Sequence, residues 1–283
     1  MSDALLDEIL AVTMAADPDL ILLTGDYVED DPAPIHPLSD RLRLLTDRYP
    51  GRVFASLGNH DIKVAGAREE IIAALSDAGV GVLWNQTVFP LGSRTDLALV
   101  GFADRNSGEM TTSVINSLLG DPDQVYGAAA DQVCPDGNNG TDPISAATNG
   151  GNQPVVLPAS TPRLVLTHNP DTLTRLRDVR VDLALCGHTH GGQVALFGVP
   201  VLRPVCWAVN TLLPRRVARF LPGFFRSVKH WEWASGLFRF TAESGAGAVG
   251  GQSLAFTSRG LGAHLFGRLW CPPEVAIITL VRS

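Results

Sequence analysis

Cysteine is scarce in this sequence, and no long apolar run is present. The four cysteines show no C-x-x-C spacing, and Cys186 lies within an apolar run, so neither a disulfide scaffold nor a zinc ribbon is indicated. No stretch of about eighteen apolar residues and no signal peptide occurs at the start. We therefore expect a reduced, cytoplasmic protein, and these features set no limit on a targeting segment upstream of Met1.

Basic residues are fewer than acidic ones. There are 22 lysines and arginines against 29 aspartates and glutamates, which gives a net charge of −7 and a pI of about 5.4. No broad surface for nucleic acid is expected, so local metal charge would have to attract a phosphorylated substrate. The 283 residues are 45% hydrophobic, enough for a substantial core, and we expect a single domain over residues 1–283.

Four apolar runs end on side chains that commonly bind metals. In chain order, the side chains that follow the runs are Asp26; Asn59, His60 and Asp61; His168; and His188 with His190. Two imidazoles separated by one residue at the end of a strand need polar partners, and a divalent cation satisfies both. The pattern therefore predicts a metal-dependent hydrolase.

The apolar periodicity predicts alternating helices and strands. We expect helices over Asp3–Ala16, Leu38–Tyr49, Ala67–Ala78 and near Asp171–Arg177, and strands over Leu20–Thr24, Val53–Leu57, Val80–Leu83, Leu97–Phe102, Leu164–Thr167 and Leu183–Cys186. This order indicates an α/β fold with a layered sheet core and helices outside. Periodicity alone does not separate two packed sheets from one doubly wound sheet.

Taken together, the four polar segments resemble those of the calcineurin-like metallophosphoesterase superfamily. Two later segments, Thr257–Gly262 and Cys271–Glu274, resemble the bacterial subgroup that acts on phosphodiesters, including UDP-diacylglucosamine. The resemblance implies a sandwich of two packed sheets flanked by helices, with ligands on loops at the strand ends. It also implies a centre of two divalent cations (Mn, Fe or Zn) and a small phosphorylated or phosphodiester substrate.

The resemblance assigns a role to each metal ligand. Asp26 would bridge the two cations, since a carboxylate has two oxygens. Asn59, His168 and His188 would complete one metal site with it, and His190 would share the other site with Asp26.

Two further residues are assigned to catalysis by the same resemblance. His60 would face the phosphate and protonate the leaving oxygen, and Asp61 would orient His60. The reaction implied is in-line attack on phosphorus by a metal-bound hydroxide.

One part of the family pattern is absent. The family opens with Asp-x-His at the end of its first strand, but here Ser2-Asp3-Ala4-Leu5 has leucine in place of the histidine and no apolar strand before it. Asp3 is expected to begin a helix. We therefore expect that the first strand is missing, that the chain is N-terminally incomplete, and that one metal site is incomplete.

Two stretches resemble additions to the core. Residues 126–154 contain almost no large apolar side chain and predict a flexible insertion. Residues 207–240 mix arginines with aromatic residues and predict an insertion or lid, with a peripheral membrane contact through 215–233 as the alternative.

Three functions fit the sequence. The first is an active metallophosphoesterase, and the second is a degenerate, non-catalytic relative that binds a metal or a phosphorylated ligand as an interaction module. The third, an unrelated hydrolase of the amidohydrolase kind, is disfavoured because there the His-x-His pair opens the domain, whereas here it follows the other ligands.

Overall fold

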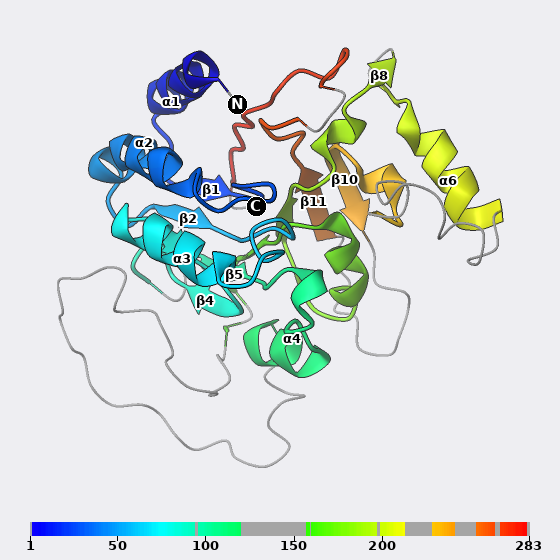
Figure 1. Ribbon diagram of the computed structural model, residues 1–283. Coiled ribbons are helices and arrows are strands. Elements are labelled where there is room, and N and C mark those ends of the chain that lie inside the picture. The colour runs from blue at the N-terminus through cyan, green and yellow to red at the C-terminus, as the bar shows by residue number, and fades with distance from the viewer. Residues whose placement is uncertain are drawn as a thin grey trace.

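The computed structural model describes residues 2–93, 96–119, 157–158, 160–196, 199–212, 228–240, 253–263 and 267–281. Within these ranges the protein has two main sheets with helices outside them, which confirms the predicted α/β architecture (Figure 1). The predicted flexible insertion at 126–154 lies outside the described residues, as do residues 213–227 of the predicted basic and aromatic insertion.

The first sheet has three parallel strands, in the order β1-β2-β3, and the N-terminal helices cover it. Its elements are α1 (Asp3–Ala16), β1 (Ile21–Leu23), α2 (Ile35–Arg48), β2 (Val53–Ala55), α3 (Ala67–Asp77) and β3 (Gly81–Val82). The Ser2 hydroxyl accepts a hydrogen bond from the Leu5 amide, so α1 begins at Asp3 as predicted. Each helix buries one apolar stripe in a common core with the strands.

The second sheet has six strands in the order β10-β11-β7-β6-β5-β4. Its strands are β4 (Gln86–Val88), β5 (Ala98–Gly101), β6 (Arg163–Leu166), β7 (Leu183–Cys186), β10 (Gly236–Phe240) and β11 (Ser253–Thr257). The four inner strands are parallel, and the two edge strands are antiparallel to their neighbours. Helix α4 (Thr112–Leu119) and the 3₁₀ helix η2 (Pro170–Arg175) pack on its outer face.

The two sheets pack face to face through apolar side chains. Phe54 of β2 and the partly buried Leu22 of β1 join Leu99, Leu164 and Leu183 of the second sheet in one buried cluster. This shared core identifies two packed sheets rather than one doubly wound sheet.

Three smaller elements belong to the C-terminal half of the chain. A hairpin of β8 (Ala195–Leu196) and β9 (Val199–Pro200) leads into α6 (Leu202–Leu212), which extends to the right in Figure 1. None of the helices in the described part of the chain is long and apolar enough to cross a membrane.

Several expectations need correction. Residues 236–240 are not part of an insertion, because β10 pairs along its whole length with β11 as the edge of the second sheet. The helix expected near Asp171–Arg177 is a 3₁₀ helix, begun by Asn169, whose side chain accepts a hydrogen bond from the Asp171 amide. Strands β4, β10 and β11 and helix α4 were not predicted, since their short apolar patterns are ambiguous in isolation.

Candidate metal centre

Three of the predicted ligands meet because the strands that precede them end at one edge of the sandwich. Asp26 follows β1, Asn59 follows β2, His168 follows β6 and His188 follows β7. Parallel strands within each sheet bring their carboxyl ends together. The site therefore draws its ligands from both sheets.

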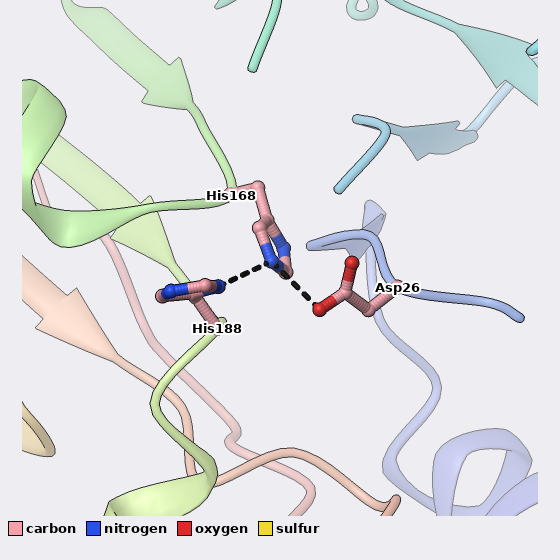
Figure 2. Close-up of side chains that lie close together, drawn as sticks. All are labelled: Asp26, His168 and His188. Atoms are coloured by element: carbon pink, nitrogen blue, oxygen red, sulfur yellow. Dashed lines mark hydrogen bonds and ion pairs between the residues drawn. The ribbon is translucent and has the colours of Figure 1, made fainter. Parts of the chain in front are cut away.

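Three side chains converge on one point (Figure 2). The Nε2 atom of His168 lies 2.9 Å from Oδ2 of Asp26 and 3.1 Å from Nδ1 of His188. Nitrogen and oxygen ligands about 2.0–2.1 Å from one cation lie roughly 3 Å apart, so this spacing fits a metal site. On the other side of its ring, His168 places Nδ1 2.6 Å from the Thr24 carbonyl oxygen, which directs Nε2 toward the site.

Asn59 is a fourth candidate ligand. Its Oδ1 atom is buried and has no hydrogen-bond partner among the described residues. Buried polar atoms are normally hydrogen-bonded, and Asn59 follows β2 at the same edge as the cluster, so its orphaned amide oxygen is a candidate metal ligand. The donor set of one carboxylate, one amide and two imidazoles therefore fits a divalent metal.

The turns that carry these ligands are conformationally demanding. Asp26 and His188 have φ angles of 59° and 68°, in the region that non-glycine residues seldom occupy. Glycines permit the close approach of the β1 and β2 turns: a Cβ at Gly58 would lie 2.1 Å from Oδ1 of Asp26, and one at Gly25 would lie 2.5 Å from the Gly58 nitrogen. Packing of the two turns thus fixes the Asp26 carboxylate.

The structure gives Asp61 a different set of partners from the one predicted. Its fully buried carboxylate accepts hydrogen bonds from the backbone amides of Asp26, Tyr27, Val28 and Gly58, at 2.8–3.2 Å. Asp61 therefore fastens the β1 turn to the β2 turn.

The His60 ring has a backbone partner. Its Nδ1 atom lies 3.1 Å from the Glu29 carbonyl oxygen, and its backbone amide donates to Oδ1 of Asp26 at 3.0 Å. His60 consequently sits beside the metal cluster, with its ring fixed by the loop after β1.

The electrostatics of the site favour a bound cation. Burial opposes ionisation of Asp26, but the adjacent His168 outweighs it and holds the pKa of Asp26 well below its usual range. Burial alone would lower the pKa of His168, yet the Asp26 charge raises it to about 9. Burial raises the pKa of Asp61 to about 6, although the Gly58 amide opposes the rise. The Asp26 charge thus favours the protonated form of His168 in the metal-free site, and a cation would compete with this proton.

His190 lies outside the cluster of three. Its Nδ1 atom is 3.0 Å from the Gly262 carbonyl oxygen, in the segment that follows β11. The buried Cys271 thiol donates to the His190 carbonyl oxygen at 3.4 Å, and Arg268 donates to the Gly262 carbonyl oxygen at 2.7 Å. The C-terminal segment therefore holds the turn that carries His190.

One buried acid at this edge was not predicted. Asp104 follows β5, is completely buried and feels the charge of His168. The signal was present in the sequence, because the apolar run that includes β5 also ends on an acidic residue.

Several known proteins are similar in sequence to this chain. The sequence profile described as "Calcineurin-like phosphoesterase" matches residues 2–192. The phosphodiesterase YaeI of Escherichia coli is 30% identical over 98% of this chain and 76% of its own length. The UDP-2,3-diacylglucosamine pyrophosphatase LpxG of Chlamydia trachomatis is 26% identical over 98% of this chain and 78% of its own. The uncharacterized metallophosphoesterase YkuE of Bacillus subtilis is 27% identical over 69% of this chain and 55% of its own. No solved structure matches the chain.

Proposed function

The chain belongs to the calcineurin-like phosphoesterase family and is therefore a metal-dependent hydrolase of phosphoric esters, and we propose that it cleaves phosphodiesters at a centre of two divalent cations. The observation that most supports this proposal is the convergence of Asp26, His168 and His188 on one point. The orphaned Oδ1 atom of Asn59 supports it independently. The names of two relatives, a phosphodiesterase and a pyrophosphatase, favour a diester or diphosphate as substrate.

In this proposal the complete metal site consists of Asp26, Asn59, His168 and His188. Bound divalent cations would polarise the phosphoryl oxygens and lower the pKa of a water nucleophile. The mixed oxygen and nitrogen donors suit Mn, Fe or Zn.

His60 is the proposed proton donor to the leaving oxygen. Its Nδ1 contact with the Glu29 carbonyl oxygen places Nε2 on the opposite side of the ring. Because the ring orientation is fixed, Nε2 can stay aligned with the leaving oxygen for proton transfer. Asp61 supports His60 through the backbone of the β2 turn, which its carboxylate ties to the β1 turn.

The second cation would be held by Asp26 and His190 together with ligands from outside the described residues. We propose that these ligands lie in a strand upstream of Met1. Two observations support this. Among the described strands β1 pairs with β2 alone, so the other edge of β1 has no strand beside it. In the stretch 275–281, the apolar side chains of Ile277 and Val281 are 70% and 84% exposed, so they are not covered by the described residues. A chain extended upstream should gain thermal stability and activity together, and equal melting temperatures with equal rates would contradict this part of the proposal.

A peripheral membrane contact through residues 215–233 remains a proposal. Exposed Val201 and Val205 lie one helical turn apart at α6, and exposed Leu212 ends the helix before the basic and aromatic stretch. Vesicles containing phosphatidylserine should sediment the protein, whereas neutral phosphatidylcholine vesicles should not. A double charge reversal, Arg215→Glu with Arg219→Glu, should abolish this binding, and Arg43→Glu on α2 should not.

Activity can be tested with two chromogenic substrates in the presence of Mn²⁺. We expect bis(p-nitrophenyl) phosphate to be cleaved faster than p-nitrophenyl phosphate. His60→Ala should lower turnover by about a hundredfold or more while bound Mn²⁺ is retained. The matched control is His36→Ala, because the His36 side chain is 61% exposed and pairs with Glu70 away from the cluster. Mn²⁺ binding without turnover of either substrate would instead favour a non-catalytic binding module.

A further inference from the structure

Two buried aspartates flank the loop that carries His168, and their hydrogen bonding differs. Asp171 is 3% exposed, and its carboxylate accepts hydrogen bonds from three donors. These are Nη1 of Arg105 at 2.7 Å and the backbone amides of Lys229 at 2.8 Å and His230 at 3.0 Å. Asp171 is therefore a satisfied structural carboxylate that ties the segment before β10 to the loop after β6.

Asp104 is buried as deeply but is only half satisfied. It is 0% exposed, and its Oδ1 atom accepts a hydrogen bond from the Asn106 amide at 2.8 Å. Its Oδ2 atom is buried and has no hydrogen-bond partner among the described residues. A buried carboxylate oxygen without a hydrogen-bond donor is costly. Since the same fold supplies three donors to Asp171, the missing donor at Asp104 requires an explanation.

The strand register places Asp104 beside the metal cluster. Gly101 of β5 pairs with Leu166 of β6, and the Phe102 amide donates to the Leu166 carbonyl oxygen at 3.0 Å. Asp104 lies two residues beyond Phe102, and His168 lies two residues beyond Leu166, at the same edge of the sheet. Burial raises the pKa of Asp104 and the charge of His168 opposes the rise, which is consistent with this proximity.

We propose that Asp104 is a positioning residue of the metal centre, whose Oδ2 atom accepts a hydrogen bond from a water molecule that enters with the cation. The inference rests on the proposed function, because it needs the cation held by Asp26, Asn59, His168 and His188. Oδ2 has no donor among the described residues, so a donor can enter with the hydrated cation. Carboxylates in such outer positions orient the groups around a metal and commonly change its affinity 10–100-fold.

The substitution Asp104→Asn separates this role from a structural one. It removes a buried, half-satisfied charge from the metal-free protein, so the metal-free melting temperature should stay the same or rise. Mn²⁺ affinity should nevertheless fall by about 10–100-fold. The matched control, Asp171→Asn, should do the reverse: it turns an amide NH2 group toward at least one of the three donors that the carboxylate satisfies, so the metal-free melting temperature falls while Mn²⁺ affinity is unchanged.

Both quantities can be measured on the full chain by calorimetric titration with Mn²⁺ and by thermal unfolding in chelator. Asp104→Ser provides a second variant, since serine can still accept the Asn106 amide while the free carboxylate oxygen is lost. We expect Asp104→Ser to weaken Mn²⁺ binding as Asp104→Asn does. Wild-type affinity in both Asp104 variants would overturn the inference alone. Absence of Mn²⁺ binding by the wild-type protein would overturn the proposed function and this inference with it.

Discussion

The Nε2 atom of His168 lies 2.9 Å from the Oδ2 atom of Asp26, so a residue that follows β6 in one sheet contacts a residue that follows β1 in the other. The candidate centre therefore depends on how the two sheets pack. Any change that shifts one sheet relative to the other should alter metal binding before it alters secondary structure.

The two histidines of the His-x-His segment should differ in their effect on the metal content of the protein. The wild-type chain should retain about one metal after exhaustive dialysis, since the described residues supply one complete set of proposed ligands. His188→Ala should lose this metal, because it removes one of the three converging side chains. His190→Ala should retain it, because His190 contacts Gly262 outside that cluster. Elemental analysis that finds two metals per wild-type chain would contradict this assignment.

Asp61→Asn should destabilise the fold, rather than weakening only the orientation of His60. The new side chain would direct its NH2 group toward two of the four backbone N–H groups that donate hydrogen bonds to the Asp61 carboxylate. The free energy of unfolding should fall by about 3 kcal/mol or more, measured by urea denaturation. The control is Asp40→Asn, whose side chain is 74% exposed and should cost little. Equal stability of the two variants would show that Asp61 does not fasten the turns.

Two glycines with nearly the same φ angle should respond differently to alanine. Gly25 and Gly92 have φ angles of +89° and +88°. An added Cβ would lie 2.5 Å from the Gly58 nitrogen in the first case and would meet no atom of the described residues within 4 Å in the second. Gly92→Ala should cost only the backbone strain of about 1–2 kcal/mol. Gly25→Ala should cost more and also release the metal, because the turn that holds Asp26 must move. Retention of metal by Gly25→Ala would refute the argument from close approach.

The stability of the metal-free protein should fall as the pH rises from about 6.5 to about 9. The pKa of His168 is raised from 6.5 to about 9 in the folded state, so its contribution is complete below 6.5 and is lost as the pH passes 9. The loss should amount to a few kcal/mol, since one pKa unit corresponds to about 1.4 kcal/mol. Stabilisation by added Mn²⁺ should grow over the same range, because the cation displaces this proton.

Thermal unfolding in chelator at pH 6.5 and pH 9 tests this expectation. His168→Gln provides the control, because it removes the titrating group and should flatten the pH dependence in this window. Asp61 does not interfere, since its pKa of about 6 confines its effect to lower pH.

Local sequence was sufficient to locate most of the elements and the three side chains that converge at the candidate centre. The acidic Asp3 and the apolar stripe that follows it predict α1 over Asp3–Ala16, and the run Leu183–Cys186 forms β7 as predicted. Apolar runs that end on Asp26 and His168 place these side chains at strand ends, because a buried strand must stop where polar groups begin. These features depend on neighbours in the chain, so they are visible without coordinates.

Tertiary packing alone decided which groups the polar side chains of the site bond to. Asp61 accepts amides from the β1 turn, and the contact of His190 lies in a segment that follows β11. The pairing of β5 with β6 brings Asp104 close to His168, and only the packed structure shows that its Oδ2 atom has no donor among the described residues. A carboxylate or imidazole can bond to any donor or acceptor within reach, and reach is set by how distant segments pack, so residue type and spacing leave these roles open.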